Sequence, residues 1–143
     1  MRFYFAAPFS YGERLRDLAR FIDNIFDGPR QCWTTASWIY IPTGTRAKNH
    51  LEAANYALLD LENVDACDVL IMFNPEDGSQ SPGRNVEYGY AVAKGKQIWL
   101  VGPKTSVFSY LPGIRYFKDE EDVKQYLTVL GDDLLCPYEA KRP

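Results

Sequence analysis

The chain has 143 residues, a length typical of a single domain, and its 16 basic and 19 acidic residues give a net charge of −3. This slightly acidic balance argues against a basic surface that binds the phosphate backbone of a nucleic acid. Hydrophobic residues make up 46% of the sequence, enough to bury a core, but no run of 18 apolar residues exists that would predict a membrane span. The three cysteines are an odd number without CxxC spacing, so we expect neither a disulfide framework nor a metal site, and a cytoplasmic location.

The hydrophobic pattern predicts strands and helices in alternation along the chain. We expect strands at residues 2–7, 32–41, 68–73, 97–101 and 114–117. We expect helices at residues 13–26, 46–64, 84–94 and 118–130. Such alternation predicts an α/β fold, a three-layer sandwich with a five-stranded, mainly parallel sheet in flavodoxin-like or Rossmann-like order. Residues 1–130 would form this domain, and residues 131–143 a polar C-terminal tail.

A polar loop with Gly and Pro, residues 74–83, lies between a buried strand and the following helix. Open α/β sheets bind their ligands at the carboxyl ends of strands, here residues 6–10 and 73–87. The N–H groups at a helix N-terminus are unpaired and lie at the positive end of the dipole. Ser81, Gly83 and the N–H groups near Arg84 and Asn85 therefore predict a cradle for an anion.

Two carboxyl groups flank this region. Glu87 is in the first turn of the expected helix, where it either complements the helix dipole or stays ionised beside the cradle and attacks a sugar carbon. Asp60 is near the end of the preceding helix, as either a solvated charge or a partner carboxyl that donates a proton. Two carboxyls in one cleft are what glycosidic-bond cleavage uses.

The pattern Ser81-x-Gly83-x-x-x-Glu87-x-Gly89, preceded by Asp60, resembles the nucleoside 2-deoxyribosyltransferase family, including its deoxynucleoside 5′-monophosphate N-glycosidase-like branch. Residues 4–10 and 102–112 extend the resemblance, which covers about residues 2–128. It implies an enzyme in which Glu87 forms a covalent glycosyl intermediate, Asp60 assists the departing base and Tyr4 orients the nucleophile. We expect no cofactor.

The same resemblance implies how the substrate is held. It places Phe5, Pro8, Phe9 and Ser10 on the strand and loop that contact base and sugar, although this loop lacks the basic, Gly-rich character of the monophosphate-cleaving members. Family members that transfer deoxyribose between free bases have an acidic residue at the position of Ser81. A serine there does not repel a phosphate, so it favours a nucleotide as the substrate. Ser109 falls where a neighbouring subunit contacts the phosphate, which implies a homodimer or higher homo-oligomer with a shared active site. Arg84 is a candidate charge partner.

Three functions follow from this reading. The first is cleavage of the N-glycosidic bond of a (deoxy)nucleoside 5′-monophosphate through a glycosyl-Glu87 intermediate that water resolves. The second is transfer of deoxyribose from one nucleobase to another. The third is a non-catalytic nucleotide-binding module, because a fold by itself does not imply catalysis.

Overall fold

The computed structural model describes residues 1–25 and 32–135. Five strands form one sheet in the order β2-β1-β3-β4-β5, and every neighbouring pair is parallel. This is the strand order of flavodoxin-like folds. The strands are β1 (Arg2–Ala6), β2 (Trp33–Thr34), β3 (Val69–Phe73), β4 (Gln97–Val101) and β5 (Arg115–Phe117).

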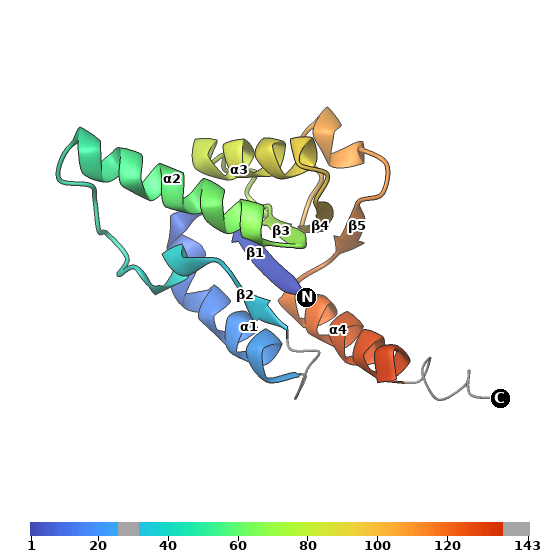
Figure 1. Cartoon of the computed structure of the whole chain (residues 1–143). Helices are drawn as coiled ribbons and strands as arrows, with labels where there is room; N and C mark the ends of the chain where they lie inside the picture. The colour runs from blue at the N-terminus through green and yellow to red at the C-terminus, as the bar shows by residue number, and fades with distance from the viewer. Residues whose placement is uncertain (26–31, 136–143) are drawn as a thin grey trace.

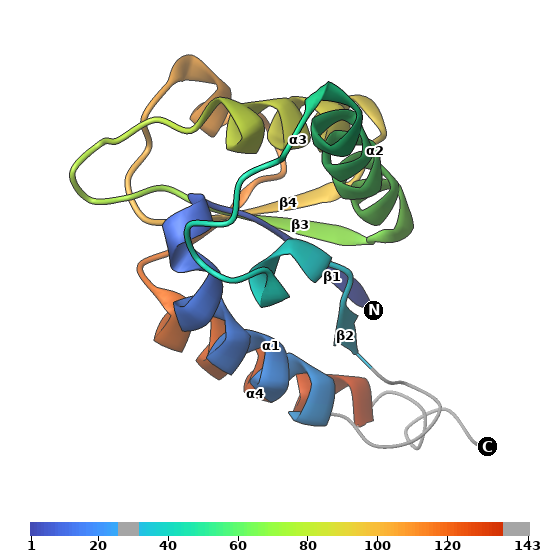
Figure 2. The ribbon, with the colours of Figure 1, turned by 90° about the vertical axis from the view of Figure 1, so that its left-hand side faces the viewer.

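Two layers of helices cover the sheet, which confirms the expected three-layer α/β architecture. The helices α2 (His50–Ala66) and α3 (Pro82–Ala93) lie on one face, and α1 (Gly12–Ile25) and α4 (Glu120–Leu135) on the other (Figure 1). Short 3₁₀ helices occupy three connections: η1 (Phe9–Tyr11), η2 (Ser37–Tyr40) and η3 (Val107–Tyr110). A view from the side shows the same layers, with the segment between η2 and α2 crossing one end of the sheet (Figure 2).

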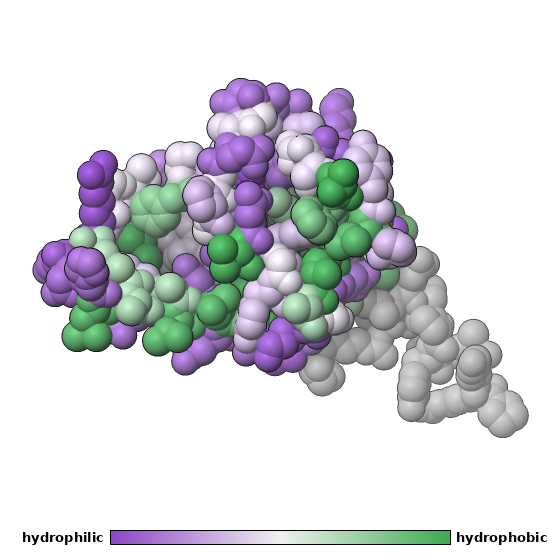
Figure 3. All heavy atoms as spheres, turned by 90° about the horizontal axis from the view of Figure 1, so that it is seen from above, coloured by the Kyte–Doolittle hydropathy of each residue, from purple (hydrophilic) through white to green (hydrophobic). Residues whose placement is uncertain are grey.

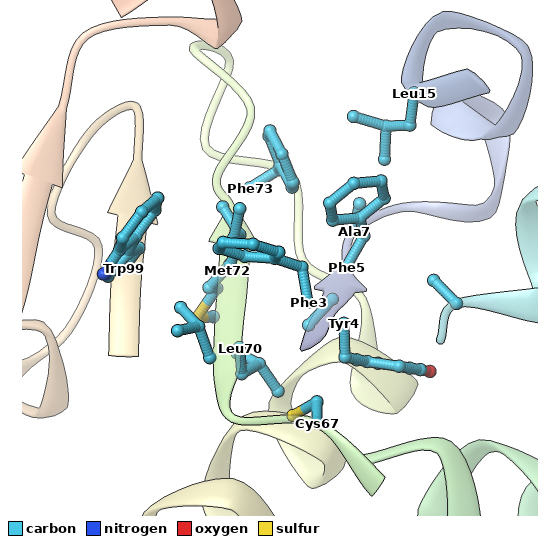
Figure 4. Close-up of a cluster of buried hydrophobic side chains, with 14 of the residues drawn as sticks. Phe3, Tyr4, Phe5, Ala7, Leu15, Cys67, Leu70, Met72, Phe73 and Trp99 are labelled. Carbon is cyan, nitrogen blue, oxygen red and sulfur yellow. The ribbon is translucent and has the colours of Figure 1, made fainter. Parts of the chain in front are cut away.

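The central strand β1 has opposite roles on its two faces, because successive side chains of a strand alternate. Phe3 and Phe5 lie on the α1 and α4 side of the sheet, against Trp99 and Phe73 respectively. Tyr4 is directed the other way, as Figure 4 shows, toward the α2 and α3 side. One strand thus supplies both the aromatic core and a polar group for the opposite layer.

The predicted strand at residues 32–41 was wrong for most of its length, since only Trp33 and Thr34 pair with β1. The backbone ladder continues as far as the Thr35 N–H, which donates to the Phe3 carbonyl. The next acceptor, the Phe5 carbonyl, receives the indole N–H of Trp38 at 2.8 Å. The Trp38 side chain thus occupies the carbonyl that a further residue of β2 would need as its backbone acceptor. The strand ends there, and residues 37–40 form η2.

Several helix boundaries differ from those expected. The helix α2 begins at His50 rather than residue 46, because the Asn49 side chain caps it by accepting from the Glu52 N–H. The helix α3 begins two residues earlier than expected, with Pro82 in its first turn, where a missing N–H costs nothing. The helix α4 continues to Leu135, and residues 136–143 of the expected tail are outside the described part of the chain.

The loops that follow β3 and β4 cross in close contact at the carboxyl end of the sheet. The Asn74 N–H donates to the Val101 carbonyl at 2.9 Å, and Gly102 has a φ of 92°. A Cβ at Gly102 would lie 2.3 Å from the Asn74 carbonyl oxygen. Only glycine fits here, and the crossing fixes where the loop from β3 to α3 begins.

Candidate active site

A cavity of about 250 Å³ opens at the carboxyl ends of β1 and β3, beneath α2 and beside the start of α3. We call it the Glu87 cavity. It includes both carboxyls singled out from the sequence, the α3 N-terminus and part of η2. Its lining residues are Ala7, Phe9, Ser37, Trp38, Ile41, Thr45, Ala47, Tyr56, Leu59, Asp60, Ser81, Gly83, Arg84 and Glu87.

The phenol of Tyr4 contacts the candidate nucleophile directly. Its Oη donates a hydrogen bond to Glu87 Oε1 at 2.9 Å, joining β1 to α3. Tyr4 is fully buried, and burial, with the nearby Glu87 carboxyl, raises the pKa of the phenol well above its ordinary value. The hydroxyl therefore keeps its proton and acts as a fixed donor, which orients the Glu87 carboxyl.

Glu87 differs from its expected state. It was expected in the first turn of the helix and ionised, but it is the sixth residue of α3, beyond the turn where the dipole is effective. Its pKa is raised to about 8, mainly by burial; the Tyr4 hydrogen bond opposes this rise and the nearby Asp60 carboxyl adds to it. The expectation of a permanently ionised carboxylate was therefore wrong, because desolvation outweighs the helix terminus. At neutral pH the free protein holds Glu87 mainly protonated.

Asp60 enters the cavity from α2 and is also partly withdrawn from water. Burial raises its pKa to about 6. Tyr56, one helical turn earlier on the same face of α2, lines the cavity too and donates its hydroxyl to Glu52. The cavity thus contains two carboxyls whose pKa values both lie near neutrality, an environment typical of acid–base chemistry.

The N-terminus of α3 offers unused donors at the mouth of the cavity. Ser81 is the N-cap, but its hydroxyl makes no capping hydrogen bond. The first intrahelical bond runs from the Asn85 N–H to the Ser81 carbonyl, at 3.2 Å. Helix geometry leaves the N–H groups of Gly83 and Arg84 without an intrahelical acceptor, and they and the Ser81 hydroxyl could hold an anion.

The guanidinium of Arg84 is held inside the protein. Its side chain is 1% exposed and donates to the carbonyls of Phe73 at 3.0 Å and Ser79 at 3.2 Å. Burial lowers its pKa. Arg84 therefore fastens the loop between β3 and α3 onto the helix, with only part of its side chain at the cavity wall.

An aromatic wall closes the cavity on the side of the β1 loop. Phe9 is 39% exposed, and its ring centroid lies 6.1 Å from that of Trp38. Phe5, expected in the site, packs instead in the core on the opposite face of the sheet. Pro8 and Ser10 are the sequence neighbours of Phe9, but neither lines the cavity. Of the expected loop, Phe9 alone presents a side chain to the cavity.

Ser109 lies apart from the Glu87 cavity. It is buried in η3, where its Oγ accepts from the Thr105 and Ser106 N–H groups. It lines a second cavity of about 470 Å³ between η3 and α3, together with Asn85 and Tyr88. Within one chain the structure therefore brings together Tyr4, Asp60, Ser81, Gly83 and Glu87, and leaves Ser109 elsewhere.

Sequence reasoning did not assign several residues of the cavity. Tyr56 had a usable signal, because its four-residue spacing from Asp60 places both on one helix face. Ile41 and Leu59 had none, since Ile41 was assigned to a strand and Leu59 to the core. Over residues 1–25 and 32–135, no three His, Cys, Asp or Glu side chains gather as a metal site would require. No helix in these ranges is long and apolar enough to span a membrane.

The fold and cavity together define an α/β protein with a carboxyl pair at the edge of a parallel sheet. Neither a protein-family model nor a curated protein sequence matches the chain. The solved structures that share its fold include two enzymes. The CMP N-glycosidase BcmB of Clostridium botulinum has a TM-score of 0.61 and 20% identity, over 90% of this chain and 99% of that one. The 2-deoxyribosyltransferase of Bacillus psychrosaccharolyticus has a TM-score of 0.64 and 17% identity, over 92% and 96%.

Proposed function

We propose that this chain is an enzyme of the nucleoside 2-deoxyribosyltransferase-like family that cleaves the N-glycosidic bond of a (deoxy)nucleoside 5′-monophosphate. The observation that carries the proposal is the Tyr4–Glu87 hydrogen bond in a cavity that Asp60 also lines. The fold shared with a CMP N-glycosidase and a 2-deoxyribosyltransferase supports the same chemistry.

In the first step, the Glu87 carboxylate attacks C1′ of the sugar from the face opposite the base. The bond from C1′ to the base nitrogen breaks, its electron pair leaves with the base, and Asp60 supplies the proton that the base takes up. Tyr4 keeps the attacking carboxyl in position. The product is a glycosyl ester on Glu87.

In the second step, water attacks C1′ of this ester. Asp60, now ionised, takes a proton from the water, and the carbon–oxygen bond to Glu87 breaks. Two displacements give net retention at C1′. The products are a free base and a (deoxy)ribose 5-phosphate, and the pair of carboxyls returns to its starting charge.

The reaction needs one proton on the pair, with Glu87 ionised and Asp60 protonated. The two raised pKa values, about 8 and about 6, mean that the pair carries one proton between these limits. In the free protein this proton rests mainly on Glu87. Its transfer to Asp60 is therefore part of reaching the reactive state.

The 5′-phosphate is assigned to the N-terminus of α3. Ser81 and the N–H groups of Gly83 and Arg84 provide hydrogen-bond donors without a negative charge. The buried Arg84 guanidinium adds positive charge behind them. The Phe9 and Trp38 wall is assigned to the base.

The decisive experiment is a panel of nucleosides and nucleoside 5′-monophosphates, analysed by chromatography for free base. We expect base release from a monophosphate, with loss of activity on the order of 10⁴-fold in Glu87→Gln. Intact-mass analysis of rapidly quenched wild-type protein should detect a glycosyl adduct that Glu87→Gln lacks. Binding of nucleotides without any base release would instead support a non-catalytic module.

The likeness to a 2-deoxyribosyltransferase favours transfer as the second candidate. In that case a free base, rather than water, attacks the ester on Glu87. Incubation of a deoxynucleotide with a different free base separates the two, because only transfer makes a new nucleotide.

We also propose that the protein is a cytoplasmic homo-oligomer. The face formed by α2, α3 and η3 carries apolar side chains among polar ones, as Figure 3 shows from above. Leu51, Leu58, Val107 and Phe108 are between 59% and 79% exposed there. Burying them against a second copy would bring its η3, with Ser109, toward the shared site. Reducing conditions would keep the buried Cys32 and Cys67 as free thiols.

A further inference from the structure

A strap of exposed residues, 42–49, joins η2 to α2 past one end of the sheet (Figure 2). At its start the Thr45 N–H donates to the Pro42 carbonyl at 3.1 Å, in a turn that Gly44 permits with a φ of 88°. At its end the Glu52 carboxylate accepts from the Lys48 N–H. These bonds fix the two ends of the strap locally.

The strap contributes to the cavity wall and also carries charge. Thr45 and Ala47 line the cavity, together with Ser81 and Gly83 of the α3 N-terminus. Arg46 and Lys48 alternate with them in the sequence and are exposed. Long, flexible stems of this kind let a cationic group reach several ångströms from its backbone. Arg46 and Lys48 are therefore each next in sequence to a residue of the cavity wall, in the strap whose wall residues share the cavity with Ser81 and Gly83.

The other cations near the cavity are already engaged. Arg84 donates to the carbonyls of Phe73 and Ser79. Arg16 donates to the Ile39 carbonyl, and Arg14 pairs with Glu120. Within the described ranges, neither Arg46 nor Lys48 forms an ion pair. The loop after β1 supplies no cation, since its residues at positions 7–10 are Ala, Pro, Phe and Ser.

The carboxyls of the cavity would repel an anionic ligand, and cations beside it would offset that repulsion. Asp60 and Glu87 face the same space, and Glu52 stands beside Tyr56. A phosphate would experience these carboxyls at close range, and a helix terminus offers only about half a positive charge against them. Side chains that bring a full charge, in an orientation that donates hydrogen bonds, would offset the repulsion.

We propose that the strap is a phosphate clamp in which Arg46 and Lys48 bind the 5′-phosphate of a substrate held at Ser81 and Gly83. The inference rests on the proposed function and adds the residues that select a monophosphate over a nucleoside. The clamp forms when the strap's cationic side chains turn inward over the anion.

The test compares two double variants that each remove one arginine and one lysine. Arg46→Ala with Lys48→Ala removes the clamp, and Arg20→Ala with Lys124→Ala removes equal charge from α1 and α4, across the sheet. We expect the ratio of kcat/KM for a monophosphate to that for its nucleoside to fall about ten-fold or more in the strap variant. In the control the ratio should stay within about two-fold, as for surface charges remote from a site. An unchanged ratio in the strap variant would overturn the clamp.

A binding measurement separates failure of the clamp from failure of the proposed function. Calorimetric titration with 2-deoxyribose 5-phosphate requires no turnover. If no nucleotide is cleaved, the proposed function fails, but the clamp is still supported where the sugar phosphate binds the wild type more tightly than the strap variant. That difference should shrink at high salt, because screening weakens charge pairs in contact with solvent. Equal binding to both proteins would remove the clamp on its own.

Discussion

The phenol of Tyr4 and the carboxyl of Glu87, 83 positions apart in the sequence, meet in a 2.9 Å hydrogen bond. The strand residue is rigid because it is fully buried, and burial raises the pKa of the helix residue to about 8. The bond opposes part of that rise, since a donor stabilises the ionised carboxylate. Orientation and ionisation of the candidate nucleophile therefore depend on the same phenol.

Tyr4→Phe should slow the reaction and shift its pH dependence. Without the donor, the pKa of Glu87 rises further, so we expect kcat/KM at pH 7 to fall about ten-fold, the value of one hydrogen bond to a charged group. The pH limb near 8 should move upward. Tyr90→Phe is a matched control, because Tyr90 is on α3 but donates to Asp65, outside the cavity. A profile that does not move would show that Tyr4 serves packing alone.

The pH profile of kcat/KM should be bell-shaped, with limbs near 6 and near 8. Below the lower limb both carboxyls are protonated and no nucleophile is present. Above the upper limb both are ionised and no proton is available for the departing base. Initial rates with a monophosphate at constant ionic strength would measure the limbs. In Asp60→Asn, the alkaline limb should change, because it depends on the proton that the two carboxyls share. A wild-type kcat/KM that is flat from pH 5 to 9 would exclude the carboxyl pair as the catalytic acid and nucleophile.

Glu87→Gln should make the protein more stable at alkaline pH. Burial raises the folded-state pKa of Glu87 from its ordinary 4.5 to about 8, so the unfolded chain releases this proton more readily. The free energy of unfolding therefore falls as pH rises from about 4.5 to about 8 in the wild type, but Gln has no proton to lose. We expect the variant's Tm to exceed the wild type's by on the order of 5 °C at pH 9 and to approach it at pH 4. Glu62→Gln, on exposed α2 surface, is the control.

Gly102→Ala should destabilise the protein much more than Gly113→Ala. Both glycines have a left-handed φ, 92° and 86°, but only at Gly102 would the new Cβ strike backbone, the Asn74 carbonyl oxygen. We expect a loss on the order of 3 kcal/mol or more at Gly102 and about 1 kcal/mol at Gly113, where left-handed strain acts alone. Urea denaturation measures both. Equal losses would mean that the crossing of the two loops relaxes at no cost.

Ser81→Asp should reverse the preference for a phosphate. A carboxylate at the N-cap would repel a 5′-phosphate and could accept a hydrogen bond from a free 5′-hydroxyl. We expect the monophosphate-to-nucleoside ratio of kcat/KM to fall about ten-fold or more. Ser79→Asp adds the same charge to an exposed loop residue and should leave the ratio near its wild-type value. If both variants behave alike, the phosphate is not at Ser81.

Much of this fold could be predicted because buried parallel strands are continuous apolar runs, as at β3 and β4. The end of β2 at Thr34 could not be predicted, since nothing in residues 32–41 shows that the Trp38 indole would donate to the Phe5 carbonyl. The pKa of Glu87 was missed for a similar reason, because its burial comes from Tyr4 and α2, which are distant in sequence. The position of Phe5 was predictable, because a residue next to Tyr4 on a strand faces the other way.

The alternation along β1 has a consequence for how this protein can change. In this five-residue strand, Phe3 and Phe5 pack in the hydrophobic core, whereas Tyr4 contacts Glu87 in the candidate active site. Inserting or deleting one residue within β1 would turn each following side chain to the opposite face of the sheet. A phenyl ring would then face the carboxyl pair, and the tyrosine hydroxyl would be buried in the hydrophobic core. Length variation should instead accumulate at exposed residues 76–80, so insertion libraries should recover functional clones there and none within β1.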